Sequence, residues 1–562
     1  MKTHDDARAD LAAWREAKPS NFYDADPFFQ RVLAHHLGAD RLAAEAPGLS
    51  AFGAECAGLL DALVCETNRD EHLPVLRRFD GIGRRTEEVV FHPAYDVIGE
   101  RVYRTGVMAR YATPGQETVQ LAYAWLFSQN GEGGHLCPLA CTAGLIKILQ
   151  RRAPAAVRDR FLPGLLRTDR GHPDHYHGAQ FLTEIQGGSD VGANACVATP
   201  AADGTWRING EKWFCSVIDA DLYLMTARPD GAPAGTPGLG AFVVPRRLPD
   251  GQPNGVFVRR LKYKLGTRSM ASGEADFHDA VAWPVAAEGG FKAVVEIVLN
   301  TSRLYNAIAS TGSMRRVQHE ATAYAAHRRA FGQPIDRFPL VARTLARIEA
   351  ETQGGTAGTF ALAALADRIE LGQGSRADEA LFRLVVNMNK YWTSIRSTAV
   401  IHDGIEVLGG NGAIEDFSVL PRLYRDAIVC ESWEGTHNVL VQQVLKDASR
   451  YAAHTAFIAE LRESLKKLSL PAEHAPLLER AGSGLSALER GFEKLAGGQG
   501  DQRFGRALVD QAAVCLEVVA MLEELAATPE DTVKRAAIEL VSQRFLLDEV
   551  PLPAAIPAAL LS

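Results

Sequence analysis

The apolar residues of this 562-residue chain change their spacing twice, and this change limits the folds that the chain can adopt. From about 51 to 168 they recur at helical spacing, as in Phe52, Cys56 and Leu59. Between 180 and 284 short runs of branched and aromatic residues alternate with turn signals, and helical spacing then returns. The pattern predicts an α+β fold in the order helices, sheet, helices.

The middle region, residues 180–284, predicts an antiparallel β-barrel or sandwich. Short strands at close spacing with hairpin turns between them are typical of these closed or folded-over sheets. The dipeptides that favour such turns are Asp203-Gly204, Asn209-Gly210, Asp230-Gly231, Asp250-Gly251 and Asn254-Gly255.

The region from 285 to 450 predicts a four-helix bundle. No proline occurs between Pro284 and Pro334. A single helix over this run would be roughly 60 Å long, which is too long for an isolated surface helix. Residues 338–371, residues 377–408 and the region after Glu434 supply the other three helices.

The two ends of the chain predict further helices. Residues 1–50 form an N-terminal extension to a helical domain at 51–179, within which residues 77–83 predict a turn-rich connector. Residues 451–562 form an additional helical block, with 11 basic and 16 acidic residues and a net charge of −5. One helix start in this block is predicted at Thr528, with Pro529 and Asp531 in the first turn.

Composition limits the partners of the chain. Its formal net charge of −8 argues against a general affinity for nucleic acid or an anionic membrane. No run of about 18 uninterrupted apolar residues is present, so we expect no membrane segment. The residues after Met1 are polar and acidic, without the apolar core of a signal sequence, so we expect a cytoplasmic protein.

Metal sites are not expected from the cysteines and histidines. The eight cysteines include no Cys-x-x-Cys pair, which indicates reduced, mostly buried thiols. Two groups contain residue types that can bind metals: His135 with Cys137 and Cys141, and His172 with His175 and His177. Core packing of an apolar helix is favoured for the first group, and a solvated loop for the second.

Glu434 is the candidate catalytic base. It lies between Trp433 and Gly435, so one side of the carboxylate can be dry while a ligand approaches the backbone on the other. A carboxylate in such a place has a raised pKa and acts as a base. The alternative is a first-turn glutamate that complements the dipole of a helix beginning near Thr436.

Four separated segments have the composition of a cofactor-binding site. Hydroxyls, closely spaced glycines, an aromatic face and an arginine fork all suit a phosphate-bearing cofactor. Taken singly, each segment also has an ordinary explanation: a turn, sheet packing, a helix end or a helix stop. The segments are Phe181–Asp190, Lys212–Ser216, Arg328–Pro334 and Val407–Gly412.

Together these segments resemble the acyl-CoA dehydrogenase family of flavoproteins. Thr183–Asp190 matches its Thr-Glu-x-x-x-Gly-Ser-Asp motif, and Glu434–Thr436 matches its Glu-Gly-Thr. Arg328–Gly332 and Leu408–Gly412 match two further motifs, and the resemblance covers roughly residues 50 to 450. The chain is most similar to the AidB-like branch, on the sequences Gln186–Val191, Phe91-His-Pro-Ala and Lys212-Trp-Phe and on its carboxy-terminal extension.

The resemblance implies an FAD-dependent enzyme that oxidises an acyl-CoA thioester to its 2-enoyl form. Glu434 would be the α-proton base, because Thr301-Ser302-Arg303, where some members carry the base, lacks an acid. An electron-transfer flavoprotein as acceptor and a homotetramer are implied in the same way. The implied cofactor contacts are Thr183, Gly188, Ser189, Phe214, Ser216, Arg328, Phe331, Gly409, Gly410, Thr436 and Asn438, and the implied substrate contacts are Ser189, Arg303 and Gly435.

Finer details of the cofactor contacts also follow from the resemblance. Arg328 and Phe331 match a site that reaches the FAD of a neighbouring subunit, while Thr436 and Asn438 match contacts to its adenosine half. Two departures from the family pattern are Pro339 in place of a glutamine and Phe214 in place of a tryptophan.

Two other functions compete with the dehydrogenase. A DNA-associated protective flavoprotein like AidB, with vestigial catalysis, would need a basic carboxy-terminal surface, which the net charge of −5 opposes. A flavin oxidase or monooxygenase could use the same scaffold.

Overall fold

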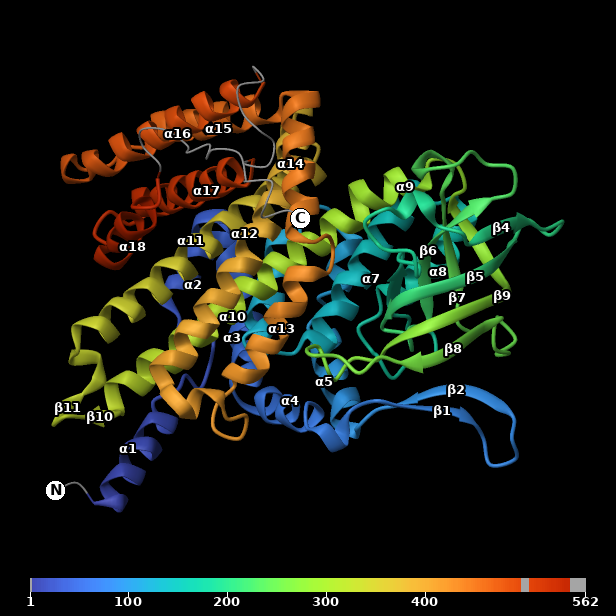
Figure 1. Ribbon diagram of the computed structural model, residues 1–562, viewed down its shortest axis with the longest axis horizontal. Helices are drawn as coiled ribbons and strands as arrows, with labels where there is room; N and C mark the ends of the chain where they lie inside the picture. The colour runs from blue at the N-terminus through green and yellow to red at the C-terminus, as the bar shows by residue number, and fades with distance from the viewer. Residues whose placement is uncertain (1–2, 497–504, 546–562) are drawn as a thin grey trace, which may run out of the picture.

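The computed structural model describes residues 3–496 and 505–545. Figure 1 shows a β domain at one side, a helical bundle beside it, and a block of C-terminal helices stacked across one end of the bundle. The predicted fold class, with an N-terminal helical domain, a middle β domain and a C-terminal helical domain, is confirmed.

The N-terminal part is helical and provides much of the core. Helix α6 is buried along its whole length, and so is α7 from Gly133 to Leu149. The helices of this part are α1 (His4–Glu16), α2 (Pro27–Leu37), α3 (Ala39–Glu55), α4 (Asp61–Thr67), α5 (Pro93–Arg104), α6 (Glu117–Ser128), α7 (Gly133–Arg152) and α8 (Ala155–Leu165).

Helix α3 includes residue 50, where the sequence predicted the end of the N-terminal extension. It continues through a π-helical turn into α4. The combined helix, Ala39–Thr67, is long and apolar enough to cross a membrane by length and composition alone, and a third of the relevant window is buried. Its buried face includes Phe52 and Leu60 in the main core, and Asp61 pairs with Arg316 of the bundle at 3.0 Å. Membrane-like composition here accompanies ordinary core packing.

A β-hairpin stands where the sequence predicted a turn-rich connector. Strands β1 (Val75–Phe79) and β2 (Arg85–Val90) pair antiparallel, with Arg77 opposite Glu88. β1 is largely exposed and β2 is only partly buried, so neither strand shows the alternation of buried and exposed residues by which a strand is recognised.

The β domain is a closed barrel with two attached strands. The pairing order β6–β4–β5–β9–β7 closes on itself because β7 also pairs with β6. Strand β3 joins at β6 and β8 joins at β9. The strands are β3 (Gly178–Phe181), β4 (Val197–Pro200), β5 (Trp206–Ser216), β6 (Leu222–Pro229), β7 (Gly240–Pro245), β8 (Val256–Leu261) and β9 (Ser272–Ala286).

Two details of the β prediction are wrong. The barrel is not wholly antiparallel, since both β3 and β4 run parallel to β6. Asn209-Gly210 is not a hairpin turn but a bulge inside β5. Gly210 has φ +139°, and a Cβ there would lie 2.6 Å from the Cys196 sulfur, so glycine is required by a close approach between strands.

The bundle is built around the predicted long helix. Short helix α9 (Gly290–Ala293) leads through a π-helical segment at Val294–Leu299 into α10 (Asn300–His327). The segment that the sequence analysis left unassigned before Glu434 is itself a helix, α13. The remaining elements are β10 (Arg329–Ala330), β11 (Gln333–Pro334), α11 (Pro339–Glu370), α12 (Arg376–Leu408), α13 (Leu420–Ser432) and α14 (His437–Tyr451).

The C-terminal block comprises α15 (Ala453–Lys467), α16 (Ala475–Ala496), α17 (Gly505–Ala527) and α18 (Thr532–Ser542). The predicted helix start at Thr528 is wrong, because that hydroxyl bonds back to Glu524. Asp531 caps α18 instead, accepting from the amides of Val533 and Lys534. A carboxylate is an equally good cap and lies closer to the first apolar turn.

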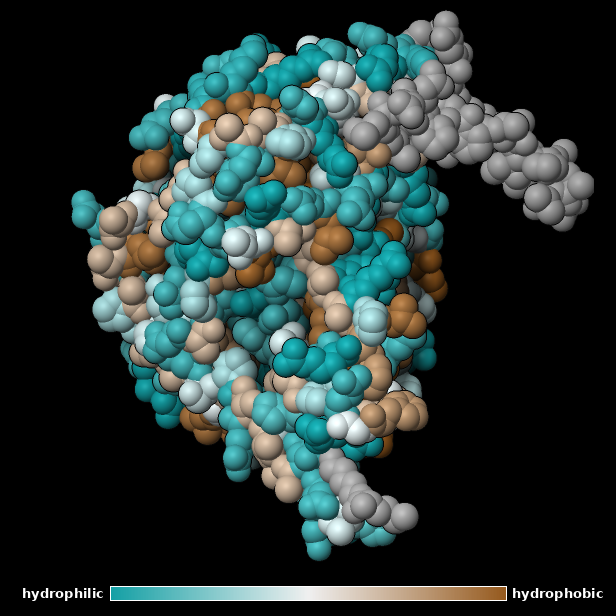
Figure 2. Space-filling model, turned by 90° about the vertical axis from the view of Figure 1, so that its left-hand side faces the viewer, coloured by the Kyte–Doolittle hydropathy of each residue, from teal (hydrophilic) through white to brown (hydrophobic). Residues whose placement is uncertain are grey.

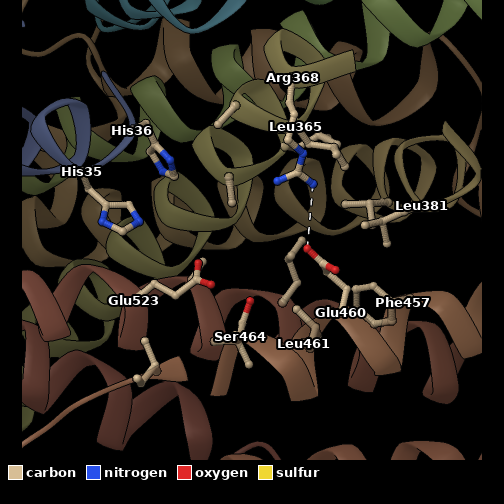
Figure 3. A pocket seen from close by; sticks show the side chains of 18 residues that line it. His35, His36, Leu365, Arg368, Leu381, Phe457, Glu460, Leu461, Ser464 and Glu523 are labelled. Atoms are coloured by element: carbon tan, nitrogen blue, oxygen red, sulfur yellow. Dashed lines mark ion pairs between the residues drawn. The ribbon is translucent and has the colours of Figure 1, made fainter. Parts of the chain in front are cut away.

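A cavity of about 320 Å³ lies between this block and the bundle. Figure 3 shows apolar side chains of α11, α12, α15 and α17 around it, with an ion pair between Arg368 and Glu460 at 3.8 Å. His35 and His36 of α2 complete its wall, which the C-terminal block, the bundle and the N-terminal part therefore share.

The far end of the bundle carries exposed apolar side chains. Phe331, in the β10–β11 turn, is 97% exposed, and Leu340 at the start of α11 is 78% exposed. The face in Figure 2 mixes hydrophilic and hydrophobic residues, with no single extended apolar band. Apolar residues scattered in this way are normal on a protein surface, and Phe331 is the most exposed large apolar side chain among the described residues.

Candidate active site

The loop between α13 and α14 places Glu434 in a strained conformation. Glu434 has φ +58° and Gly435 has φ +109°. A residue with a side chain costs about 1–3 kcal/mol in such a region and stays there only when its surroundings enforce it. The loop is therefore held by contacts outside itself.

Two cations on neighbouring helices hold the main chain of this loop. Arg303 on α10 donates from Nε to the carbonyl of Glu434 at 3.1 Å. Lys390 on α12 donates from Nζ to the carbonyls of Gly435 at 3.0 Å and Glu431 at 3.2 Å. We call Arg303 and Lys390 the cation clamp.

A third contact fixes the residue before the base. The indole of Trp433 donates to Asn306 Oδ1 at 3.1 Å, and Asn306 donates in turn to the carbonyl of Cys430 at 3.0 Å. Trp433 also packs against the apolar core of the barrel. These contacts fix Trp433, the residue before Glu434, between α10 and the barrel.

The electrostatics suit a base. Burial raises the pKa of Glu434, while the positive charges of Arg303 and Lys390 partly offset this rise. Among the described residues, no donor forms a hydrogen bond to its carboxylate, so the carboxylate oxygens are available to accept a proton. Burial also lowers the pKa of Lys390 to about 8 and that of Arg303 to about 10.

The alternative role for Glu434 does not match the structure. Helix α14 begins at His437, with Thr436 as its N-cap residue in extended conformation. Glu434 precedes that cap and has a left-handed backbone, so it is not part of the first helical turn.

Helix α13 is fixed to the other two domains. The Asp426 carboxylate accepts from the amide of Thr267, in the β8–β9 connection, at 2.6 Å, and from the amide of Gly133, at the start of α7, at 3.1 Å. These bonds set the helix that ends at the Glu434 loop against the barrel and the N-terminal domain. Burial raises the pKa of Asp426 to about 6 despite the two amides.

The barrel supplies the predicted flavin-contact residues next to one another. The carbonyl of Thr183 accepts from the amide of Trp213 at 2.9 Å, which joins the Thr183 loop to β5. Phe214 follows directly and is 55% exposed. Ser216 accepts from the Ser272 hydroxyl at 3.4 Å, so its position on β5 is set by the neighbouring strand.

The loop of the first motif is held by its own glutamate. Glu184 is buried, pairs with Lys212 at 2.7 Å and accepts from the amide of Ala195 at 2.6 Å. Gly188 lies so close to Thr183 that a Cβ would sit 2.7 Å from its hydroxyl oxygen. Ser189 is exposed at the tip of the loop.

Strand β3 connects this loop to the base. Gln180 on β3 donates to the Ser302 hydroxyl at 3.2 Å, and Ser302 directly precedes Arg303 of the cation clamp. The charge of Glu434 also acts on the Cys141 thiol of α7, the helix that packs under β3. The flavin-motif residues of the barrel and the loop that carries Glu434 are therefore connected through β3, α7 and α10.

Thr436 and Asn438 lie just after Glu434 at the start of α14, but the four other predicted cofactor residues lie far from that region. Arg328 follows the last residue of α10, 25 positions after Arg303, which at 1.5 Å per residue is about 37 Å away. Gly409 and Gly410 follow α12 at the same end, where Asn411 bonds Tyr324 at 3.2 Å. Within one chain, Arg328, Phe331, Gly409 and Gly410 form a separate distal group.

Lys390 and Asn306 were missed by the sequence analysis. Both donate to main-chain carbonyls, and such contacts leave no sequence motif. The one available signal was a lysine close to several apolar residues, Val385, Val386, Met388, Tyr391 and Trp392, since lysine is almost never fully buried without a partner.

Three family models match the chain. They are the adaptive response protein AidB N-terminal domain at residues 14–170, the acyl-CoA dehydrogenase middle domain at 179–280, and the acyl-CoA dehydrogenase C-terminal domain at 288–448. The chain is 36% identical over 403 residues to the putative acyl-CoA dehydrogenase AidB of Escherichia coli, covering 69% of this chain and 71% of that protein. The chain belongs to the acyl-CoA dehydrogenase family.

Solved members of the family share this fold. Caenorhabditis elegans ACDH-11 in complex with C11-CoA has a TM-score of 0.87 and 28% identity, covering 95% of this chain and 92% of that one. An acyl-CoA dehydrogenase from Bacillus anthracis complexed with FAD has a TM-score of 0.65 at 20% identity, covering 80% and 81%. At that identity the second match shows the fold alone.

The cation clamp leads to a prediction for Lys390. Lys390→Met removes two hydrogen bonds to the Glu434 loop and one positive charge near the carboxylate. We expect turnover at neutral pH to fall by about 10²-fold, because a base misplaced by about 1 Å loses that much. We also expect the pH below which activity is lost to rise, because the carboxylate will protonate more readily.

Lys390→Arg is the matched control, since it keeps the charge. The readouts are the pH profile of turnover and the melting temperature of each variant. A folded Lys390→Met enzyme with the wild-type pH profile would show that the clamp does not act on Glu434.

Proposed function

We propose that this protein is an FAD-dependent acyl-CoA dehydrogenase in which Glu434 removes the α-proton of an acyl-CoA thioester. The observation that carries the proposal is the Glu434 carboxylate, which accepts no hydrogen bond among the described residues, has a raised pKa, and lies in a loop that the cation clamp holds.

The barrel residues fit a flavin. Phe214 offers an aromatic face that is half exposed, and Thr183 and Ser216 offer hydroxyls on neighbouring backbone segments. Gly188 lets main-chain amides approach a ligand where a side chain would collide with Thr183. When bound, FAD would supply the acceptor for the β-hydrogen.

The residues of the chain account for the proton step. The α-proton of a thioester is acidic enough to be removed only when negative charge on its carbonyl oxygen is stabilised. A main-chain amide of the Glu434 loop is suited to donate to that oxygen. The Glu434 carboxylate takes the proton, and Trp433 keeps water from one side of it.

A homotetramer and an electron-transfer flavoprotein as acceptor are further parts of the proposal. The distal group of Arg328, Phe331, Gly409 and Gly410 lies too far from Glu434 to contact the same flavin ring within one chain. A neighbouring subunit would bring the exposed Phe331 and Arg328 to the cofactor of its partner.

Anaerobic titration with a panel of acyl-CoAs tests the proposed reaction. At least one thioester is expected to bleach the visible absorption of the flavin in the wild-type enzyme. Glu434→Gln keeps the shape of the side chain but cannot accept the proton, so we expect bleaching to slow by about 10²- to 10⁴-fold. Glu406→Gln, at an exposed position on α12, should bleach like the wild type.

Two outcomes would contradict this function. The first is a flavin-loaded wild type that no acyl-CoA bleaches. The second is Glu434→Gln bleaching at the wild-type rate. Fast peroxide formation with air as sole acceptor would instead indicate an oxidase.

The assembly is tested separately with Arg328→Ala and Phe331→Ala. Both side chains are expected to contribute to retention of FAD although they lie far from Glu434 in their own chain. We expect the double variant to lose FAD on gel filtration and to elute with a smaller mass. Full retention of FAD by a variant with an unchanged mass would place the distal group outside the cofactor site.

A further inference from the structure

Of the three loop histidines that the sequence predicted to be solvated, only His172 is substantially exposed. His175 is only 6% exposed and its ring packs edge-on against Tyr103 of α5 at 4.8 Å. The side chain of His177 is 13% exposed. The Gly/Pro/Asp composition of the loop predicts exposure, but the chain becomes buried after Asp174, which composition does not indicate.

The parallel pairing of β3 with β6 brings these histidines to two aspartates. Gly178 lies opposite Leu222, so the residues just before them, His177 and Asp221, stand side by side at the start of both strands. His177 Nδ1 lies 2.8 Å from Asp221 Oδ2, and its Nε2 lies 3.6 Å from Asp219 Oδ2. The amide of His177 also donates to Asp221 at 3.0 Å.

The cluster contains buried polar atoms without partners. Among the described residues, neither His175 Nε2 nor Asp219 Oδ1 has a hydrogen-bond partner. An unpaired buried polar group of this kind costs about 1–3 kcal/mol, so a ligand that paired with either atom would stabilise the fold. The ligand atoms that His175, His177 and Asp221 can offer all lie within 4.8 Å of one another.

We propose that His175, His177 and Asp221, with Asp219 beside them, bind a divalent first-row transition ion. Imidazole nitrogens combined with a carboxylate suit Zn²⁺ and its neighbours rather than Ca²⁺ or Mg²⁺. Ligands of a tetrahedral zinc ion are roughly 3.4 Å apart. Binding would therefore replace the 2.8 Å contact between His177 and Asp221 and bring the three ligand atoms, which lie within 4.8 Å of one another, to that spacing. Nothing in the proposed dehydrogenase reaction uses these residues.

The ion would have a structural role. It would tie the α8–β3 loop to the β5–β6 connection, at the start of the strand that leads to Gln180 and Thr183. The charge of Arg246 acts on both aspartates and opposes a cation, so we expect weaker binding than at a zinc site with thiolate ligands.

A second group of possible ligands makes a poorer site. His402, Asp403 and Glu406 on α12 also lie within 4.8 Å of one another, but His402 and Glu406 are exposed. Both oxygens of Asp403 already accept from Arg347, at 2.6 and 2.8 Å. This group therefore serves as an internal comparison.

Metal content of the full-length, tag-free protein tests the proposal. The protein is stripped with a chelator, given Zn²⁺, passed through gel filtration and analysed for zinc and for melting temperature. We expect about one zinc per chain in the wild type and a higher melting temperature with zinc than without, because an ion that binds only the folded state stabilises it.

Variants locate the ion. His175→Gln and Asp221→Asn should each lose the bound zinc and the rise in melting temperature. His172→Gln, which changes the exposed end of the same loop, and His402→Gln should retain both. Two substitutions at the site guard against one of them failing to fold.

The proposal is overturned if the wild type retains no more zinc than His175→Gln, which would leave the cluster as a histidine–aspartate ion pair only. It is also overturned if His402→Gln removes the zinc while His175→Gln keeps it. None of these outcomes depends on dehydrogenase activity.

Discussion

The active region depends on two buried cations that donate hydrogen bonds to main-chain carbonyls in and next to the Glu434 loop. Arg303 and Lys390 reach the carbonyls around Glu434 from α10 and α12, two long helices that pack against each other. Their hydrogen bonds oppose the strain of a left-handed glutamate, about 1–3 kcal/mol. Their positive charges oppose the effect of burial on its pKa. A single pair of side chains thus sets both the position and the proton affinity of the acid.

This arrangement explains why the chain needs all three domains. Asp426 ties α13 to amides of the barrel and of α7. Gln180 ties the barrel to Ser302, next to Arg303. The loop that carries Glu434 is therefore located by contacts from every side.

Much of this could be predicted from the sequence, because the strongest signals are local. The change of apolar spacing gave the order of the domains, and the proline-free run gave the long helix. Glu434 stood out by its neighbours Trp433 and Gly435. Lys390 could not be found in this way, because a side chain that donates to a main-chain carbonyl 41 or 45 residues away leaves no motif.

Errors arose where tertiary contacts override local preference. Asn209-Gly210 has the composition of a hairpin turn, yet the nearby Cys196 turns it into a bulge within β5. His175 sits in a loop whose composition indicates solvent, yet it packs against Tyr103. The parallel pairs of β3 and β4 with β6 join segments that are distant in sequence, and short strand patterns carry no record of direction.

The most direct measurement of the central claim is hydrogen exchange at the α-carbon of a bound acyl-CoA. The flavin-loaded enzyme is incubated anaerobically in D₂O with a saturated acyl-CoA, and the recovered thioester is analysed by mass spectrometry. If Glu434 is the base, deuterium enters the α-position with the wild type and not with Glu434→Gln. Equal exchange by both enzymes would show that another group removes the proton.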